Sequence, residues 1–407
     1  MSSTANRQSI PSPVPLLASR AEALEKVRAL VPRIRARAEK AESDRRIPDE
    51  TIAELLDAGL FNIATPRASG GANLGFATLV EVASAIASAC GSSGWVYGVL
   101  TGHSWMAALF PPQAQAEVFA NPRVLTASVF RLGGKTIPVD GGYRLVGGEG
   151  RFCSGIDFAD WVIVGNAVHR PDGTTEPRFL LVSTQDVEIV DDWFTAGMRG
   201  TGSRTIRVKD AFIPEHRTVL SADLMRGTSP GATHHKDAPN YSVPFAVAQP
   251  FSLIGAPLGM ARSAVDTLAE SLTKKFGAMP VEQASEQGAL FVRLAKAAAD
   301  VDAAEALILR DAALLDALTD PAKLSAVDRS RVQRDLAYAA QSCRYAVTSL
   351  FEAGGGSGIY DSSALQRIWR DVNSATAHMA FNWDDAAANF GRFRLGLPPS
   401  RFAGPRR

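Results

Sequence analysis

The chain has 407 residues, of which 46% are hydrophobic and 21% are charged. This balance is typical of a soluble globular protein and excludes a disordered chain or a fibre, and the length predicts two or three packed domains. The 43 basic and 42 acidic side chains leave a formal charge of +1, so neither nucleic acid nor a membrane surface is an expected partner. Cys90, Cys153 and Cys343 lie far apart without a C-x-x-C spacing, which favours the reducing cytoplasm.

The first part of the chain predicts a short arm followed by helices. Residues 1–20 hold three prolines and no apolar run of signal-peptide length, so we expect a flexible arm. Residues 21–122 predict an N-terminal helical domain, in which one helix starts after Pro48 and stops at Gly59 and another covers 77–89. No later stretch approaches the roughly twenty apolar residues that cross a bilayer.

The middle of the chain changes to short β-branched runs separated by turn residues. Residues 123–225 therefore predict a small antiparallel β domain. The expected strands include 143–146, 161–168, 179–182 and 206–208. Residues 226–242 show no periodicity and predict an exposed loop or lid.

Residues 243–407 predict a C-terminal helical bundle domain. Apolar residues step by four and three along 290–308 and along 336–350, as they do on the buried face of a helix. The second stripe ends at the glycines 354–356, and a further helix is expected from near Ser362 to beyond Asp385.

Several familiar chemical motifs are absent from the sequence. There is no G-x-G-x-x-G after a strand, no G-K-[ST], no H-E-x-x-H and no G-x-S-x-G, which removes the main support for several enzyme classes, among them Rossmann dehydrogenases and zinc proteases. No cysteine or carboxylate stands at ligand spacing from His234 and His235, so no metal site is expected. Taken alone, His103 and His378 have apolar or small neighbours, which favours an interior or interface histidine over a catalyst at each position.

Other segments resemble the acyl-CoA dehydrogenase superfamily. They are Ile47-Pro-Asp-Glu50, Gly197-Met-Arg-Gly-Thr-Gly-Ser203, Lys275-Phe-Gly277, and Gly355-Gly-Ser-Gly358 followed by Arg370-Asp371. The resemblance extends from about Ala21 to Leu397. It implies an α+β, acyl-CoA dehydrogenase-like fold with an N-terminal helical domain, a middle antiparallel β domain and a C-terminal four-helix bundle.

Within that superfamily, the details resemble a branch that oxygenates its substrate. Met379 stands where the common dehydrogenases have a glutamate base, and a thioether cannot take up a proton. His378, Gly102-His103, Phe152–Gly155 and Asp191–Trp193 are instead similar to oxygenase components of two-component flavin monooxygenases. The groups resembled are the 4-hydroxyphenylacetate 3-hydroxylases and the steroid-phenol hydroxylases.

This resemblance implies a reduced-flavin-dependent monooxygenase. A separate reductase would supply exchangeable reduced FMN or FAD, and O2 would form a C4a-hydroperoxyflavin that inserts one oxygen atom into an aromatic substrate, phenolic or indolic. Ser154 matches the hydroxyl that hydrogen-bonds flavin N5, and Ser128 matches a position facing the flavin ring. His103 and His378 match two histidines of the substrate pocket, one or both of which assist removal of a phenol proton.

The resemblance also implies cofactor anchors and an assembly. Arg262 matches a flavin phosphate contact, and Gly355 and Gly356 match backbone that meets the cofactor of a neighbouring subunit in a homotetramer. Thr273 replaces an arginine common in the dehydrogenases, which favours exchangeable flavin. The alternatives are an acyl-CoA dehydrogenase with tightly bound FAD and a relocated base, and a non-catalytic module for assembly or flavin storage.

Overall fold

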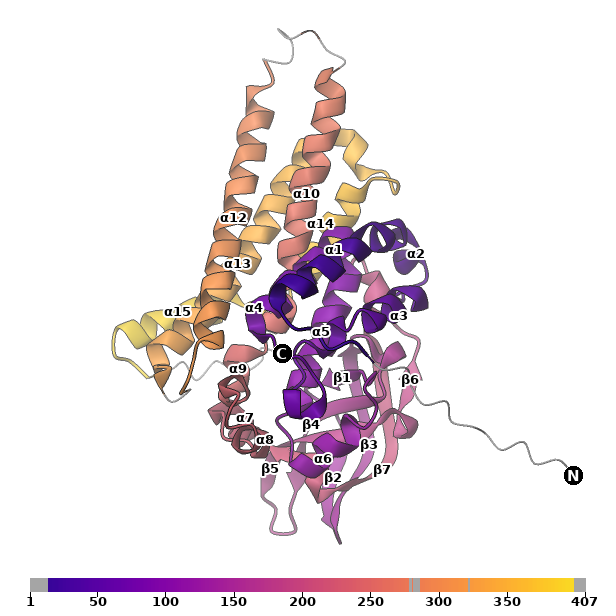
Figure 1. Cartoon of the computed structure of the whole chain (residues 1–407), viewed down its shortest axis with the longest axis vertical. Helices are drawn as coiled ribbons and strands as arrows, with labels where there is room; N and C mark the ends of the chain where they lie inside the picture. The colour runs from indigo at the N-terminus through magenta and orange to yellow at the C-terminus, as the bar shows by residue number, and fades with distance from the viewer. Residues whose placement is uncertain (1–13, 278–279, 281–285, 321–322, 399–407) are drawn as a thin grey trace, which may run out of the picture.

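The computed structural model describes residues 14–277, 280, 286–320 and 323–398. Helices, then strands, then a second set of helices follow one another along the chain, in the expected order. The helices of the C-terminal region form one end of the molecule, the sheet forms the other, and the N-terminal helices lie between them (Figure 1).

The N-terminal region consists of six α-helices. They are α1 (Arg20–Ala36), α2 (Ala38–Ser43), α3 (Asp49–Asp57), α4 (Gly75–Ala89), α5 (Gly91–Ala107) and α6 (Pro112–Val118). As predicted, α3 begins after Pro48, and the chain leaves it through Gly59 at a φ of +75°. Every residue of α5 is buried, because this helix packs against other N-terminal helices, the sheet and the C-terminal bundle.

The central region is a sheet of eight strands. The strands are β1 (Thr126–Val129), β2 (Lys135–Val139), β3 (Gly142–Cys153), β4 (Trp161–His169), β5 (Thr175–Ser183), β6 (Glu188–Val190), β7 (Arg204–Pro214) and β8 (Thr218–Leu220). Their order is β6-β7-β3-β2-β4-β5-β8, and β1 pairs with β4. The sheet is mixed rather than wholly antiparallel, because β1 and β2 both run parallel to β4.

The segment expected as an exposed loop is folded onto the N-terminal region. It follows α7 (Ser221–Arg226) and contains α8 (Pro230–His234), and it leads to α9 (Phe245–Ala248). The N–H of Gly231 donates to the carbonyl of Leu109 at 3.1 Å, and the side chains of His235 and Tyr241 are buried. Lack of periodicity therefore reflects short helices, and the expectation of an exposed loop is wrong.

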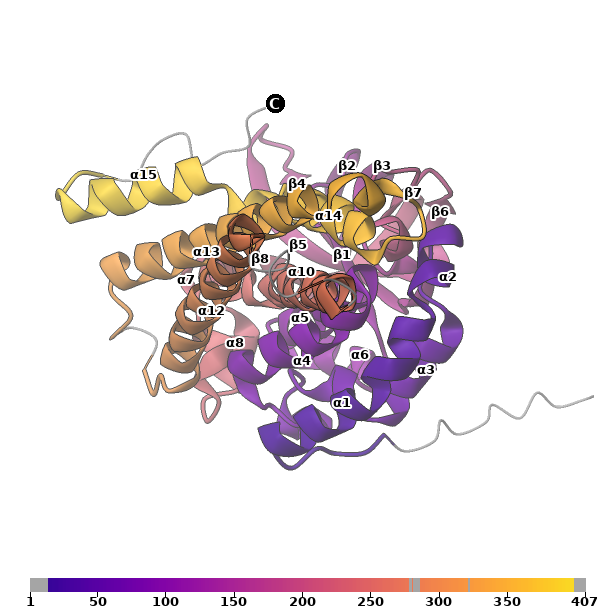
Figure 2. The ribbon, with the colours of Figure 1, turned by 90° about the horizontal axis from the view of Figure 1, so that it is seen from above.

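The C-terminal region is a helical bundle. Its helices are α10 (Phe251–Gly277), α12 (Gly288–Asp316), α13 (Ala326–Ala353), α14 (Ala364–Ala375) and α15 (Trp383–Arg394). Helices α10, α12, α13 and α14 pack against one another, whereas α15 lies at the outer edge on α13 (Figure 2). The stripe along 336–350 is buried as predicted, and α13 ends before Gly354.

The single long helix expected after Ser362 is wrong. The chain breaks between α14 and α15, where His378 has an extended backbone and its ring Nδ1 accepts a hydrogen bond from the N–H of Ala380. Asn382 then caps α15 by accepting from the N–H of Asp385. Helix α14 thus ends at Ala375, the His378 side chain caps a short 3-10 turn over Met379–Phe381, and Asn382 starts α15, so His378 lies in neither helix.

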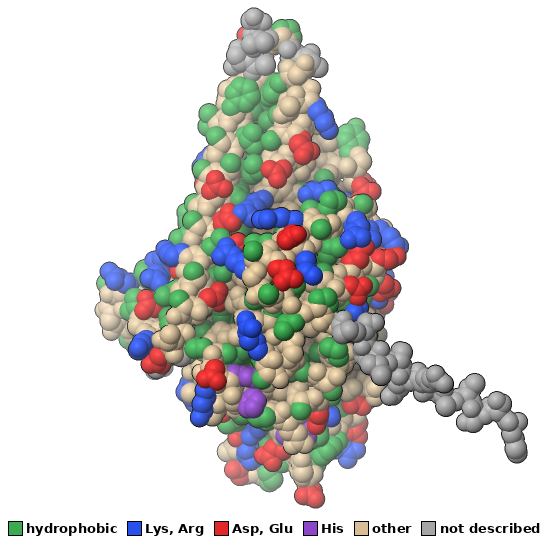
Figure 3. Space-filling model, in the orientation of Figure 1, with side chains coloured by type: hydrophobic (Ala, Val, Ile, Leu, Met, Phe, Trp, Pro, Cys, Tyr) green, Lys and Arg blue, Asp and Glu red, His purple; other side chains and the backbone are tan. Residues whose placement is uncertain are grey.

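Close packing of α5 on α10 fixes the centre of the molecule. A Cβ atom built on Gly98 would lie 2.1 Å from the carbonyl oxygen of Ser252, so only glycine permits this approach. On the face seen in Figure 3, basic and acidic side chains are interspersed, in keeping with the balanced charge. Among the described residues, none of the helices is long and apolar enough to cross a membrane.

Candidate active site

Ser154 lies directly after β3, at a bend in the sheet. The pairing of β3 with β7 is irregular between Gly150 and Cys153, and Phe152 and Gly155 both have left-handed backbones, with φ of +66° and +71°. A positive φ is strained for phenylalanine and is typical of a functional loop. The bend leaves the Phe152 ring exposed and buries Ser154.

The Ser154 hydroxyl belongs to a connected set of polar groups. The indole Nε1 of Trp95 on α5 donates to Ser154 Oγ at 3.2 Å. Ser154 Oγ lies 2.7 Å from Ser203 Oγ, and Ser203 Oγ lies 2.6 Å from Thr201 Oγ1. Thr201 in turn donates to the carbonyl of Met198 at 2.8 Å. Sequence reasoning missed Trp95 because nothing in a small-residue helix distinguishes this indole from an ordinary core residue.

His378 meets the same cluster from the C-terminal region. Its ring stands edge-on to Trp95, with centroids 5.7 Å apart. Burial lowers the pKa of His378 to about 4, so the ring is neutral near pH 7. Because Nδ1 accepts the Ala380 N–H, the proton of the neutral ring is carried on Nε2, and that nitrogen is a hydrogen-bond donor.

His103 forms a second polar pair with Ser128. His103 is buried on α5, and Ser128 is buried on β1. The His103 Nδ1 lies 3.2 Å from the carbonyl of Thr126, and its Nε2 lies 2.8 Å from Ser128 Oγ. A carbonyl can only accept, so Nδ1 carries the proton and Nε2 accepts from the Ser128 hydroxyl. Burial lowers the pKa of His103 to about 4.

Helix α5 relates the two groups in space. Trp95 and His103 are eight residues apart on it, which places them on the same side of the helix and about 12 Å apart along its axis. Around His103 the surroundings are aromatic, because the Phe130 ring lies edge-on to it at 6.0 Å and Phe245 lies against Phe130. The structure thus joins Ser154 to His378 through Trp95, and Ser128 to His103 directly.

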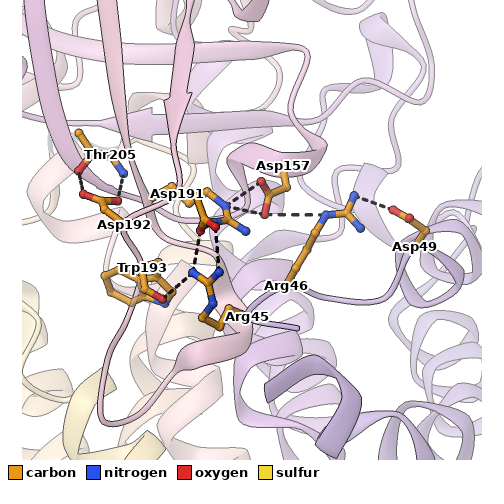
Figure 4. Close-up of polar contacts among 9 residues, drawn as sticks. Arg45, Arg46, Asp49, Asp157, Asp191, Asp192, Trp193 and Thr205 are labelled. Atoms are coloured by element: carbon orange, nitrogen blue, oxygen red, sulfur yellow. Dashed lines mark hydrogen bonds and ion pairs between the residues drawn. The ribbon is translucent and has the colours of Figure 1, made fainter. Parts of the chain in front are cut away.

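Ion pairs brace the loop between β6 and β7, which carries Thr201 and Ser203 (Figure 4). Arg45 binds Asp191 through both of its terminal nitrogens, at 2.6 and 2.9 Å, and Arg204 also pairs with Asp191. Arg204 pairs with Asp157 at 3.0 Å as well. The adjacent arginines lower the pKa of Asp191 to about 2. The loop is therefore tied to the N-terminal helices by charges that persist across the neutral range.

Helix α14 holds the same loop from the other side. The N–H of Met198 donates to Asp371 Oδ1 at 2.5 Å, and Arg370 donates to the carbonyl of Ala196 at 2.7 Å. Burial raises the pKa of Asp371 to about 6. The Arg-Asp pair that carried part of the family resemblance thus fixes the backbone next to the hydroxyl cluster.

The expected cofactor anchors lie apart from these groups. Arg262 on α10 pairs with Glu305 and hydrogen-bonds Ser84 Oγ at 3.4 Å. Gly355 and Gly356 are exposed after α13, and a Cβ on either would meet open space. None of the three contacts Ser154, His103 or His378, so their roles stay predictions.

The described residues contain few other candidates for reactive chemistry. Cys90, Cys153 and Cys343 are buried and free, and burial raises the pKa of each thiol. A buried thiol is inert, so Cys153 packs as a small hydrophobic residue. In the part of the chain that the structure describes, no group of three or more His, Cys, Asp or Glu side chains could hold a metal ion.

Two family models match the chain. They are "Acyl-CoA dehydrogenase, N-terminal domain" over residues 19–122 and "Acyl-CoA dehydrogenase, C-terminal domain" over residues 252–383. These ranges cover the two helical regions on either side of the sheet.

Characterised relatives match nearly the whole chain. The oxygenase subunit HsaA of a flavin-dependent monooxygenase from Mycobacterium tuberculosis is 35% identical over 373 residues, which cover 91% of this chain and 94% of the relative. The oxygenase component of an FADH2-dependent resorcinol hydroxylase from a Rhizobium species is 35% identical over 377 residues, which cover 90% of this chain and 92% of the relative. The crystal structure of 3-HSA hydroxylase from a Rhodococcus species superimposes with a TM-score of 0.88 at 32% identity, covering 94% of this chain and 99% of that one.

Proposed function

Because the chain belongs to the acyl-CoA dehydrogenase superfamily, among the oxygenase components of flavin-dependent monooxygenases, we propose that it hydroxylates an aromatic substrate with O2 and reduced flavin. The observation that carries this proposal is the polar cluster of Ser154, Trp95 and His378 beside the buried pair of His103 and Ser128. We take the substrate to be a phenol or an indole, since such a ring has an acidic proton that a buried imidazole can accept.

The residues around Ser154 fit a flavin ring. The Ser154 hydroxyl is buried beside Phe152, whose ring is 70% exposed and stands edge-on to Trp193 at 6.0 Å. Phe194, on the same loop as Trp193, is 68% exposed. Exposed aromatic rings beside a buried hydroxyl are suited to a flat heteroaromatic ligand with polar edges. When bound, reduced flavin supplies the activation of O2 and the transferred oxygen atom.

His103 is assigned as the proton acceptor, acting through Ser128, which in this proposal faces the flavin ring and also contacts the substrate hydroxyl. Both ring nitrogens of His103 are already engaged, so a substrate hydroxyl reaches it through the Ser128 oxygen. As the substrate proton moves to Ser128 Oγ, the Ser128 proton moves to His103 Nε2. A phenol has a pKa of about 10, so the low pKa of His103 opposes this transfer. The attraction between the negative substrate oxygen and the imidazolium across Ser128 offsets part of that cost.

His378 is assigned a different role. Its Nδ1 is occupied by the Ala380 N–H, so the neutral ring offers only an Nε2 proton. We therefore assign His378 as a hydrogen-bond donor in the pocket and not as the base. The buried aromatic rings around His103 serve to exclude water from the transferred oxygen.

The remaining assignments follow from the family. A separate reductase supplies the flavin, and the FADH2-dependent relative favours FAD over FMN. We propose a cytoplasmic homotetramer in which Gly355 and Gly356 meet the cofactor of a neighbouring subunit, and in which Arg262 leaves Glu305 to bind a flavin phosphate. Loss of the dehydrogenase base at Met379, whose side chain is 67% exposed, and the names of the relatives argue against an acyl-CoA dehydrogenase.

The test uses the purified chain, chemically reduced FAD or FMN and a panel of phenols and indoles. We expect a hydroxylated product in air without any reductase, provided that reduced flavin is supplied. His103→Ala should abolish a pH-dependent limb of the hydroxylation rate that His378→Ala retains. Failure of every substrate with both flavins, together with bleaching of bound oxidised FAD by an acyl-CoA, would identify a dehydrogenase instead.

A further inference from the structure

A continuous line of hydrogen bonds runs from α5 to the backbone of the β6–β7 loop. It passes from Trp95 through the hydroxyls of Ser154, Ser203 and Thr201 to the carbonyl of Met198, with distances of 3.2, 2.7, 2.6 and 2.8 Å. The four side chains are all buried, with exposed fractions between 3% and 8%. Water therefore does not compete for these groups, and the direction of each hydrogen bond is determined by the protein.

The two ends of this line fix the direction of every proton in it. Each hydroxyl has one hydrogen, a carbonyl can only accept, and an indole N–H can only donate. Thr201 must therefore give its hydrogen to the Met198 carbonyl, and so Ser203 gives its hydrogen to Thr201. Ser154 in turn gives its hydrogen to Ser203. The reverse direction would bring two lone pairs together at one of these short distances.

This direction determines what Ser154 can offer to a ligand. Its hydrogen is committed to Ser203, and one of its two lone pairs receives the Trp95 N–H. One lone pair remains, and no other residue of the described chain hydrogen-bonds Ser154 Oγ. Ser154 is thus an acceptor only, and a ligand atom placed against it must carry a hydrogen.

We propose that Ser203 and Thr201 are positioning residues that make the site selective for reduced over oxidised flavin. The inference rests on the proposed function, in which Ser154 faces flavin N5. Nitrogen N5 carries a hydrogen in the reduced ring and only a lone pair in the oxidised ring. A fixed acceptor therefore stabilises the reduced ring and repels the oxidised one, which favours release of spent cofactor.

The carbonyl that anchors the line is itself held in place. Met198 has a left-handed backbone, its N–H donates to Asp371, and its carbonyl also accepts from the indole of Trp193 at 3.0 Å. Since these contacts hold the peptide groups on both sides of Met198, Thr201 keeps its acceptor. The selectivity then depends on hydroxyls that touch neither substrate nor cofactor.

The test compares dissociation constants for reduced flavin, measured without oxygen, and for oxidised flavin. Both FAD and FMN are titrated into the full-length protein and followed by flavin absorbance and fluorescence. In Ser203→Ala the Ser154 hydrogen is released and can donate to oxidised N5. We expect the preference for reduced flavin to fall about tenfold, the equivalent of one hydrogen bond, mainly through tighter binding of oxidised flavin.

Further variants separate this effect from damage to the site. Thr201→Val should lower the preference in the same way, because Ser203 then donates to Ser154, whereas Thr201→Ser should restore it. Trp95→Phe removes a donor to Ser154 without freeing its hydrogen, so the preference should persist. Ser104→Ala is the matched control, since Ser104 is a buried serine on α5 that hydrogen-bonds a backbone carbonyl.

The outcomes distinguish failure of the proposed flavin selectivity from failure of the proposed function. If wild type prefers reduced flavin and neither Ser203→Ala nor Thr201→Val changes that preference, the inference is overturned and the proposed function stands. If wild type binds neither form of FAD or FMN, the proposed function fails and this inference with it. Thr201→Ser and Thr201→Val decide the question even if Ser203→Ala does not fold.

Discussion

Acidification should destabilise the fold through His103, and the size of the effect can be worked out. The ring is buried between α5 and β1, and it is neutral because its pKa falls from 6.5 to about 4. The unfolded chain therefore takes up a proton on this residue before the folded chain does. The stabilisation is complete above about pH 6.5 and is lost as the pH falls towards 4.

The full difference between 6.5 and about 4 corresponds to about 3 kcal/mol of unfolding free energy. At pH 5 the unfolded residue is almost fully protonated and the folded one is mostly neutral, so about 2 kcal/mol is lost relative to pH 8. His235 and His378 also have pKa values lowered to about 4, so wild type loses more than this in total.

A difference between variants isolates the contribution of His103. His103→Gln is expected to lower the stability at pH 8, but its further loss between pH 8 and pH 5 should be about 2 kcal/mol smaller than that of wild type. Reversible urea unfolding at both pH values measures this, with His169→Gln on the exposed end of β4 as the control. Equal losses in His103→Gln and wild type would show that the ring is not held neutral by burial, and would remove the basis for its assigned role.

Three further predictions concern the polar cluster and its supports. Ser128→Ala should lower the hydroxylation rate about 100-fold by interrupting the path to His103, whereas a change in KM alone would exclude a proton-transfer role. Ser154→Ala should still bind reduced flavin but release more hydrogen peroxide per product, and unchanged coupling would remove Ser154 from oxygen transfer. The pKa of Asp371 is raised to about 6, so its contribution favours the fold at low pH and is lost as the pH rises through 6. Between pH 4 and pH 7, the unfolding free energy of Asp371→Asn should therefore rise by about 2 kcal/mol relative to that of wild type in chemical unfolding, and a relative fall would contradict this.

Periodicity predicted the elements that bury one continuous face. The stripe along 336–350 lies inside α13, and the stripe along 290–308 lies inside α12, because one face of each helix packs on the bundle. Periodicity did not predict how the strands pair. The strand β1 has only four residues, all buried, and its parallel register with β4 depends on contacts between distant segments.

Periodicity also did not predict where the helical regions are interrupted. After α14 ends, side-chain caps at His378 and Asn382 start the next turn and helix α15, and these are local hydrogen bonds that an apolar pattern does not reveal. The segment 226–242 is polar and irregular in sequence, yet it buries His235 against Gln115, with 2.8 Å between His235 Nε2 and Gln115 Oε1.

The sequence suggests candidate site residues but not how they are arranged. The family resemblance singled out Ser154, Ser128 and both histidines, while Trp95, which joins Ser154 to His378, gave no signal in the sequence. The contact of His103 with Ser128, and the Nε2 proton of neutral His378, on which the proposed roles depend, follow only from hydrogen-bond partners. Such partners are set by tertiary packing, which local sequence patterns do not record.

The most direct test of the central claim is a single turnover with isotopically labelled oxygen. The protein is loaded without oxygen with one equivalent of reduced FAD and the best aromatic substrate of the panel, and it is then mixed with 18O2 in ordinary water. Mass spectrometry should find one 18O atom in the hydroxylated product, with the other in water. Product oxygen that comes from the solvent, or hydrogen peroxide with no product, would contradict an oxygenase.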